Sequence, residues 1–325
     1  MGSPLRSETG RSAQGFDRRA AGMAPGDIGL GLLAAVLWGM TFVITAAALE
    51  RVPPILFTAL RFAAAAALIA IVPRPAASWR VVVAAGLLLG AAQFGCLFTA
   101  MAAGVPPGMA AVLVHTQAIM MVALGALLLG ERPRAGDILA CGLALAGVVV
   151  LALAKQGTGP LSGMALVLLA ALSGAAGNLV LKRAGSANSL SFAVWMSVVP
   201  PLPLFALSLW LEGPERVVAA LVASDWVVIG AVAYSALLST VLAYAIWGRL
   251  FGRYPSTRTA PFLLLVPIVG LASSMALLGE PLTVAKALGA GLVLAGLGLA
   301  ALARSRWAGA ARVDRQDPAG KPETN

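Results

Sequence analysis

The chain has 325 residues, of which 60% are apolar and only 11% are charged, and its mean hydropathy is +0.91. In soluble domains about a quarter of the residues are charged, so this composition excludes an ordinary soluble protein and predicts an integral membrane protein. The net charge of +10 is explained by the topology described below, and no nucleic-acid partner is expected.

Ten apolar segments follow one another along the chain, and each is close to the length of about 20 residues that crosses the hydrocarbon core as a helix. We predict spans at residues 27–49, 54–72, 79–101, 107–129, 135–154, 163–181, 190–211, 226–248, 259–278 and 285–303. The runs are long and apolar on all sides, which favours helices over a strand barrel. The predicted fold class is therefore an all-α integral membrane protein with ten transmembrane helices.

The basic residues predict the orientation of these spans. With the N-terminus in the cytoplasm, 18 of the 23 Lys and Arg residues fall on the cytoplasmic side, four fall outside and Arg61 lies within a span. This asymmetry follows the positive-inside rule. We therefore expect a multi-pass protein of the bacterial inner membrane with both termini in the cytoplasm. Residues 1–26 and 305–325 are polar and basic, and we expect them to be flexible tails.

Two stretches of the chain match each other at a spacing of 149 residues. Residues 128–131 (Leu-Leu-Gly-Glu) reappear as residues 277–280, and residues 142–147 reappear in similar form as residues 291–296. We therefore predict two five-helix repeats, residues 27–155 and residues 156–304. Because an odd number of spans separates equivalent points, the copies are expected to have opposite orientations, as in the inverted repeats of secondary transporters.

The repeated turn carries an acidic residue in each copy. A chain rich in Leu, Ala and Gly can match itself by composition alone, but the match of Glu131 with Glu280 argues against that explanation. Each carboxylate follows the end of an apolar span. We expect both to be structural and to lie at the bilayer surface, where a solvated carboxylate costs little.

Arg61 is the one charge that lies clearly within a predicted span, and no Asp or Glu occurs at a depth where it would pair with the guanidinium. Two interpretations remain open. Either the long side chain has a structural role and reaches the outer interface and backbone carbonyls, or it meets an anionic group of a substrate, such as a carboxylate.

Proline and small residues predict local features of the helices. Pro261 and Pro267 in the ninth span remove backbone donors and should kink it, as should the prolines at 200, 201 and 203 in the seventh. The first two are hinge candidates for a gate, although such kinks also shape static packing. The pairs Gly86 with Gly90 and Gly142 with Ala146 predict close helix packing, and they do not establish an oligomeric state.

Several kinds of chemistry have no counterpart in the sequence. It contains no P-loop, no HExxH helix and no second histidine for a metal cluster. ATP-driven transport by this chain alone is therefore not expected. Nor do we expect a metal site, a cofactor or an enzyme, since catalysis needs a positioned acid, base or nucleophile.

Short motifs carry a family resemblance. They are Trp38-Gly39, Leu60-Arg61-Phe62, the repeated Leu-Gly-Glu turn, Ala92-Gln93-Phe94, Ile246-Trp247-Gly248, Gly252-Arg253-Tyr254, Ala260-Pro261, and Leu264-Leu265-Val266-Pro267 through Leu271-Ala272-Ser273. Over residues 28–303 the chain resembles the drug/metabolite transporter superfamily in its EamA branch. Within that branch it resembles the bacterial O-acetylserine/cysteine exporter type most.

The resemblance implies a central substrate cavity lined by the first, third, fourth, sixth, eighth and ninth spans. Polar side chains in the middle of a span are costly in lipid, and so they are independently expected to face the interior of the bundle. The candidate cavity residues are Trp38, Thr41, Gln93, His115, Gln117, Asn178, Tyr234, Ser235 and Tyr244.

His115 is the only histidine, and its role has three interpretations. The exporter type carries glutamine here, followed two residues later by a glutamine that matches Gln117, which favours a hydrogen bond in the cavity. A structural role also remains open. So does a role as proton carrier, since an unperturbed histidine titrates near pH ~6.5.

The resemblance implies a secondary transporter that exports small amino acids or related metabolites, of the cysteine and O-acetylserine class, by alternating access. Its expected partners are a small-molecule substrate, the lipid bilayer and, by analogy with the family, protons as a candidate coupling ion. Two alternatives remain open. One is a broad exporter of drugs or aromatic amino acids, and the other is a non-transporting scaffold or lipid-handling protein.

Overall fold

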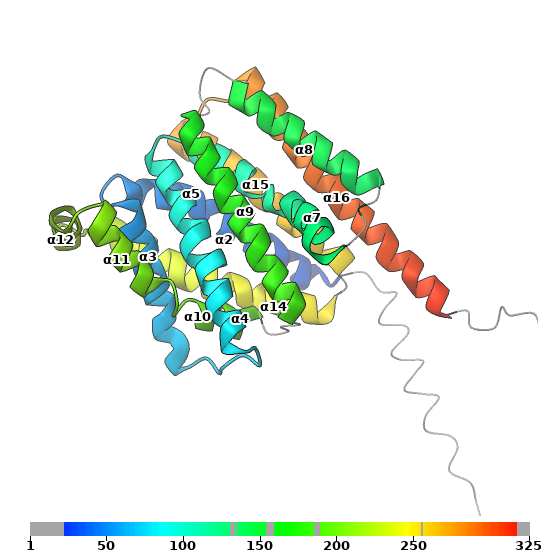
Figure 1. The fold of residues 1–325 in the computed structure, drawn as a ribbon, viewed down its shortest axis with the longest axis horizontal. Helices are drawn as coiled ribbons and strands as arrows, with labels where there is room; N and C mark the ends of the chain where they lie inside the picture. Colours follow the sequence, from blue (N-terminus) through cyan, green and yellow to red (C-terminus); the bar gives the residue numbers. More distant parts are fainter. Residues whose placement is uncertain are drawn as a thin grey trace, which may run out of the picture.

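The computed structural model describes residues 23–130, 133, 135–153, 159–184, 189–254 and 256–316, and these form helices and connecting segments without a strand. Figure 1 shows them as a bundle. The elements are α2 (Pro25–Leu49), α3 (Pro54–Ala66), η1 (Ala67–Ala70), α4 (Trp79–Ala85), η2 (Gly86–Ala92), α5 (Gln93–Ala102), α6 (Pro107–Val114), α7 (Gln117–Leu129), α8 (Ala135–Leu153), α9 (Leu161–Ala184), α10 (Ser189–Met196), α11 (Pro201–Leu211), α12 (Pro214–Val222), α13 (Trp226–Ala233), η3 (Tyr234–Leu242), α14 (Ala243–Arg253), α15 (Ser256–Leu278) and α16 (Val284–Gln316).

Some of the predicted features fall outside this description. Residues 1–22 and 317–325 of the predicted tails lie outside the described residues, as does Glu131 of the repeated turn. The rest of the second tail differs from the prediction, because α16 continues as a helix to Gln316.

Eight of the ten predicted spans correspond to helices that are long and apolar enough to cross a membrane. They are Pro25–Leu49, Trp79–Ala102, Pro107–Leu128, Ala135–Leu153, Leu161–Leu181, Trp226–Leu250, Pro261–Leu278 and Val284–Ala301. A ninth is a bent pair, Leu190–Met196 with Pro201–Leu211, whose axes differ by 41°. The predicted span at residues 54–72 is a shorter apolar helix, Pro54–Ala70. The described part of the chain is thus that of a multi-pass membrane protein.

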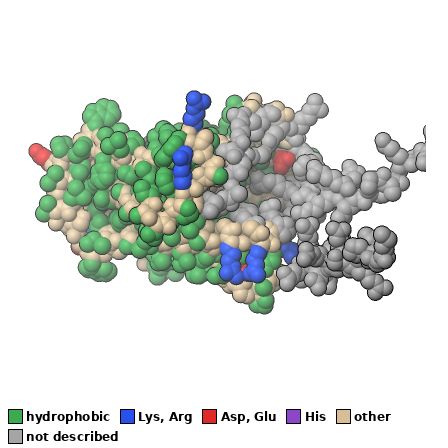
Figure 2. Space-filling model, turned by 90° about the horizontal axis from the view of Figure 1, so that it is seen from below, with side chains coloured by type: hydrophobic (Ala, Val, Ile, Leu, Met, Phe, Trp, Pro, Cys, Tyr) green, Lys and Arg blue, Asp and Glu red, His purple; other side chains and the backbone are tan. Residues whose placement is uncertain are grey.

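Apolar side chains on the outside of the bundle fit a lipid environment. On the face drawn in Figure 2, hydrophobic side chains cover most of the described surface and charged side chains are few. Leu145 of α8 and Leu202 of α11 are 65% and 80% exposed. In water such a surface would be unfavourable, whereas lipid tails are as apolar as leucine.

Two polar clusters mark the opposite ends of the bundle. At one end Asp27 of α2 accepts hydrogen bonds from Tyr254 at 2.8 Å and from Arg253 at 3.0 Å. At the other end Glu280, which follows α15, accepts hydrogen bonds from Lys286 Nζ at 3.1 Å and from the backbone N–H of Gly108 at 3.0 Å. We call these the Asp27 end and the Glu280 end.

The Glu280 end holds the largest apolar cluster among the described residues. The largest apolar cluster gathers the last turns of α2 and α5, the first turns of α3, α6, α9 and α13, and part of α12. Phe57, Phe98 and Met109 are at most 1% exposed there. The clusters nearer the Asp27 end are smaller, and one of them packs Trp247 and Leu250 of α14 against Phe262 of α15.

Glu280 does not lie solvated at the surface, as the sequence led us to expect. It is 8% exposed, and its partner Lys286 is 1% exposed. Besides Lys286 and Gly108, the hydroxyl of Ser274 donates a hydrogen bond to this carboxylate. The chain folds back between α15 and α16 so that each buried charge meets the other, which offsets the cost of burial.

The backbone repeats two unusual features at the spacing of 149 residues. The segments η2 and η3 are both π-helical, and residue 86 of the first corresponds to residue 235 of the second. Gly130 and Gly279 end α7 and α15 with φ values of 65° and 66°, a left-handed conformation that glycine adopts without steric cost. Gly130 lies at the Asp27 end and Gly279 at the Glu280 end.

Small residues allow close helix contacts, although one predicted pair was wrong. A Cβ on Gly86 would lie 2.6 Å from Val199, and a Cβ on Gly90 would clash with Pro200, so this pair packs as predicted. Gly142, however, has nothing within 4 Å, and Ala146 is exposed. The close contact of α8 with α16 is instead made by Gly147, where a Cβ would lie 2.6 Å from the carbonyl oxygen of Gly289.

Candidate functional site

A cavity of about 610 Å³ lies between the helices, lined by residues of α2, η2, α5, α6, α7, α9, α10, η3, α14, α15 and α16 and by His115. Seven of the nine predicted cavity residues line it: Trp38, Thr41, Gln93, His115, Gln117, Asn178 and Tyr244. Among the described residues that line it there is no Asp, Glu, Lys or Arg. The cavity therefore offers hydrogen bonds and aromatic surface without a fixed charge.

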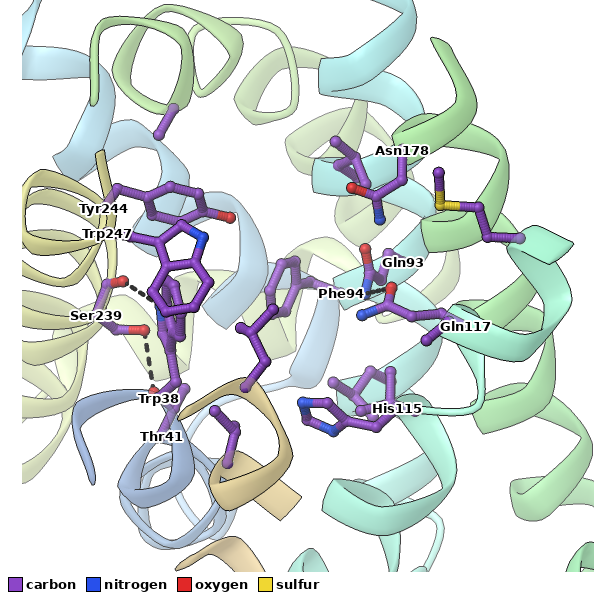
Figure 3. Close-up of a pocket in the computed structure, with 18 of the residues that line it drawn as sticks. Trp38, Thr41, Gln93, Phe94, His115, Gln117, Asn178, Ser239, Tyr244 and Trp247 are labelled. Carbon is purple, nitrogen blue, oxygen red and sulfur yellow. Dashed lines mark hydrogen bonds between the residues drawn. The ribbon is translucent and has the colours of Figure 1, made fainter. Parts of the chain in front are cut away.

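Amide groups form one side of the cavity. Gln93 starts α5, directly after the π-helical segment η2, and its Nε2 donates a hydrogen bond to Gln117 Oε1 at 3.0 Å. Asn178 of α9 donates from Nδ2 to the carbonyl of Gly174 at 2.8 Å. Figure 3 shows the two glutamines in contact, with Asn178 on the same side. These contacts leave Gln93 Oε1, Asn178 Oδ1 and the Gln117 NH₂ group for a bound solute.

His115 lies beside these amides, at a break in the fourth predicted span. Helix α6 ends at Val114 and α7 begins at Gln117, so His115 and Thr116 form a turn between them. His115 Nδ1 lies 2.6 Å from the carbonyl oxygen of Ala111. Because a carbonyl only accepts, Nδ1 must carry the proton, and Nε2 of the neutral ring is then an acceptor.

Aromatic groups form the opposite side. The ring of Trp38 makes edge contacts with Tyr244 at 5.4 Å and with Trp247 at 5.6 Å between centroids. Trp38 Nε1 donates to the carbonyl of Ser239 at 2.9 Å, and the hydroxyls of Thr41 and Ser239 are 3.0 Å apart. Figure 3 shows this group facing the amides across the cavity. These bonds orient the indole while its ring remains a flat apolar surface.

Tyr234 and Ser235 do not line the cavity. The hydroxyl of Tyr234 donates to the carbonyl of Leu37 at 2.8 Å and ties η3 to α2. Ser235 is fully buried, and its hydroxyl has no hydrogen-bond partner among the described residues. Both lie at the start of η3, and Ser239, about one turn further on, lines the cavity in their place. Both residues lie in the expected span, but the rotation of the helix does not place their side chains at the cavity.

Several lining residues were absent from the predicted set. Ser239 and Trp247 lie on the aromatic side, and Phe94 and Phe98 also line the cavity. A signal existed for Trp247 and Phe94, because each belongs to a motif that carries the family resemblance. No such signal marks Ser239 or Phe98.

Arg61 lies close to the cavity without lining it. Its side chain is 3% exposed, and Cζ lies 4.2 Å from the ring centroid of Phe94. One of the two interpretations left open was that the side chain reaches the outer interface and backbone carbonyls. In the structure the guanidinium is instead enclosed by aromatic rings.

The two hinge candidates, Pro261 and Pro267, lie within α15, which continues as a helix through both.

The cavity extends toward the Asp27 end. Its lining includes Leu181 near the end of α9, Phe192 near the start of α10 and Ala301 of α16. In the opposite direction it stops at Phe42 and Phe98, which belong to the large apolar cluster. A solute in the cavity would therefore meet packed side chains on the Glu280 side.

Comparisons with known proteins agree on one family. The sequence model of the EamA-like transporter family matches residues 26–153 and 161–302. A Salmonella typhimurium protein described as a probable amino-acid metabolite efflux pump is 38% identical over 275 residues, which cover 82% of this chain and 92% of that protein. An Escherichia coli protein of the same description is 38% identical over 276 residues, with the same shares covered.

More distant similarities concern the fold. An uncharacterized transporter of Archaeoglobus fulgidus is 26% identical over 274 residues, which cover 82% of this chain and 95% of that protein. A crystal structure of another protein, 21% identical, superposes with a TM-score of 0.55 and covers 88% of this chain and 99% of the other. That likeness indicates a shared fold alone.

Proposed function

This chain belongs to the EamA-like transporter family, and we propose that it exports small amino acids or related metabolites across the bacterial inner membrane. The family match confirms the resemblance predicted from the motifs. Two relatives at 38% identity are described as probable amino-acid metabolite efflux pumps, which supports an amino-acid substrate. The observation that carries the proposal is the uncharged cavity, in which amides and a histidine face an aromatic wall.

The chemistry of the cavity supports a zwitterion of the cysteine and O-acetylserine class. The ammonium group would donate to Gln93 Oε1 and His115 Nε2, which are acceptors without a partner among the described residues. The side chain of the solute, a thiol or an acetyl ester, would lie against Trp38 and Tyr244. A cavity without fixed charge favours a solute without net charge, because burying an unbalanced charge is costly.

The transport cycle that we propose is alternating access between two inverted five-helix repeats, residues 27–155 and 156–304. The recurrence of the π-helical segments and of the left-handed glycines at 149 residues supports this repeat. The basic residues around the Asp27 end support a cytoplasmic location for that end. A cavity that extends toward it is the arrangement expected of a state ready to receive solute from the cytoplasm.

Proton coupling belongs to the same proposal. The resemblance to the family implies the proton motive force as energy source. His115 is fixed by its bond to Ala111, and Nε2 can accept either a solute donor or a proton. Net export measured with and without a pH gradient, in the unmodified protein and in His115→Gln, separates these roles, since a proton-carrying His115 predicts that the dependence on the gradient disappears in the variant.

Exchange in sealed proteoliposomes tests the function. Vesicles loaded with unlabelled cysteine or O-acetylserine should accumulate the labelled solute. Gln117→Ala should reduce this exchange about tenfold, the effect of one lost polar contact in a site. Leu145→Ala, on the lipid-facing side of α8, is the matched control and should exchange like the unmodified protein. Absence of exchange of any labelled amino acid, with or without a pH gradient, would rule out the proposal.

One observation favours a second candidate, a broad exporter of drugs or aromatic amino acids. The cavity volume of about 610 Å³ is larger than a small amino acid requires and falls in the range of drug-sized sites. Competition distinguishes the two candidates. Tryptophan or an amphipathic drug that displaces labelled cysteine at lower concentration than cysteine itself would favour the broad exporter.

A further inference from the structure

Arg61 of α3 is a buried cation that no described residue neutralises. No hydrogen bond or ion pair joins its guanidinium to another described group, and Nη1 is fully buried without a partner. Its surroundings are aromatic. Cζ lies 4.2 Å from the ring centroid of Phe94, 5.2 Å from that of Phe62 and 5.5 Å from that of Phe98.

The aromatic rings offset only part of the cost of burying the Arg61 charge. Aromatic faces attract a cation through their quadrupole, but they do not replace the hydrogen bonds that a guanidinium makes in water. Arginine keeps its proton under physiological conditions, so it cannot escape the cost of burial by becoming neutral. A buried arginine with an unused N–H therefore favours an anion, and a carboxylate, the anionic group of an amino acid, can accept two parallel hydrogen bonds from a guanidinium.

The cavity is the space nearest to Arg61 from which an anion could approach. Two of the three rings around Arg61, those of Phe94 and Phe98, also line the cavity. Phe94 is the nearest ring, and Figure 3 places it between the amide and aromatic sides. The Phe94 ring thus separates the guanidinium from the space where a solute would lie.

Phe94 is also placed where the helix can adjust. It follows Gln93 at the start of α5, directly after the π-helical segment η2. Such segments loosen the regular hydrogen-bond pattern and are frequent at functional sites. A small rotation of α5 against η2 would carry the ring aside without breaking the rest of α5.

We propose that Arg61 is the carboxylate-binding residue of this transporter, covered by Phe94 in this structure and reached by the solute when that ring turns aside. The proposal rests on the proposed function, because it treats the cavity as the transport path. It narrows the substrate class to molecules with a free carboxylate. Amines and esters of the same size lack the group that Arg61 needs.

Equilibrium binding to the purified protein tests this independently of transport. Labelled L-cysteine, kept reduced, is displaced by unlabelled L-cysteine, by its methyl ester and by cysteamine, which lacks the carboxylate. We expect the ester and the amine to compete at least about tenfold more weakly, the ratio typical of one lost charged hydrogen bond. Arg61→Met should remove this preference, and Arg61→Lys should retain part of it.

The Phe94 ring provides a second test that does not depend on the folding of Arg61→Met. Phe94→Ala should bind L-cysteine more tightly and its methyl ester no better, because only the carboxylate gains access to the guanidinium. A purely structural arginine predicts no change in the ratio of acid to ester.

The outcomes separate the two proposals. Equal competition by acid and ester in the unmodified protein, or an unchanged ratio in both Arg61→Met and Phe94→Ala, would overturn the role of Arg61 and leave export intact. Binding of cysteine with the expected preference but without exchange in vesicles would overturn the proposed export and support the carboxylate site. Absence of binding as well as exchange would remove both.

Discussion

Gly174 of α9 stands directly behind the glutamine pair. A Cβ at this position would clash with Gln117 Oε1 and lie 2.9 Å from Gln93 Nε2. We therefore expect Gly174→Ala to displace both amides and reduce cysteine exchange about tenfold, as the loss of an ordered polar contact does. The clash involves flexible side-chain ends and alanine favours helix, so the thermal midpoint should not fall.

Gly298→Ala in α16 is the matched control for this prediction. A Cβ there meets nothing within 4 Å, so exchange should remain unchanged. Unaltered exchange in Gly174→Ala, with folded protein in both variants, would mean that the position of the amides does not matter to the solute.

The sequence indicated the polar residues of the cavity but not their contacts. Gln93, Gln117 and Asn178 were predictable because amides within an apolar span need partners inside the bundle. Ser239 was not, since the π-helical hydrogen bonds of η3 change the rotation per residue and prevent an α-helical register from being extended through it. The break at His115 likewise has no proline or glycine to announce it.

The close contact between α8 and α16 leads to a prediction about the packing of these two helices. Gly147→Leu would drive a side chain into Gly289 and Val293, whose nearest atoms lie 2.6 to 2.9 Å from a Cβ. Overpacking of this kind costs about 1–3 kcal/mol, so the thermal midpoint should fall. Gly142→Leu on the open side of the same helix is the control, and an equal loss in both variants would contradict this packing.

The ion pair of Glu280 with Lys286 leads to a second prediction about how the helices are held together. Lys286→Met leaves Glu280 buried among Gly108 and Ser274 without its cation, which costs about 3–5 kcal/mol. Glu280→Gln combined with Lys286→Met removes both charges and should recover much of the lost stability. Thermal unfolding in detergent measures both, and a double variant no more stable than Lys286→Met would show that the pair is not the cause.

The contacts of α8 and of Glu280 also show why helix packing was harder to predict than the positions of the spans. The helices are apolar all round, and lipid supplies no hydrophobic force that would fix which face turns inward. Small residues occur on both faces of α8, so the sequence alone did not distinguish Gly142 from Gly147. Glu280 was placed at the surface because its partner lies six residues further along, across a turn whose path the sequence does not reveal.

Over the whole molecule, polar contacts between the two matched segments, residues 26–153 and 161–302, occur at both ends of the bundle: Asp27 pairs with Arg253 at one end, and a second group lies at the Glu280 end. Arg51 pairs with Asp225 at 3.1 Å, and Glu212 accepts from the backbone N–H groups of Ile55 at 2.7 Å and Leu56 at 3.0 Å. Glu280 likewise accepts from Gly108. Such contacts would have to break before this end could open.

The composition and charge pattern therefore predicted the class of molecule, and the spacing of apolar runs predicted most of the spans. They did not predict that residues 54–72 form only a shorter helix, whereas the prolines at 200, 201 and 203 did predict a kink in the seventh span, which bends by 41° between α10 and α11. The prolines near residue 200 signalled that bend, but the direction in which α11 leaves depends on its packing against α3. Which end of the cavity is closed depends on such contacts and was not predictable.

Labelling of a cavity cysteine tests the central claim most directly, namely that an amino acid occupies a cavity open at a cytoplasmic Asp27 end. Met121→Cys is placed in a background with Cys96→Ala and Cys141→Ala, so that a membrane-impermeant thiol reagent has one target. In inside-out vesicles we predict rapid labelling that O-acetylserine, which has no thiol to consume the reagent, slows, and in right-side-out vesicles little labelling. Labelling that amino acids leave unchanged, or that proceeds faster from the outside, would contradict the account.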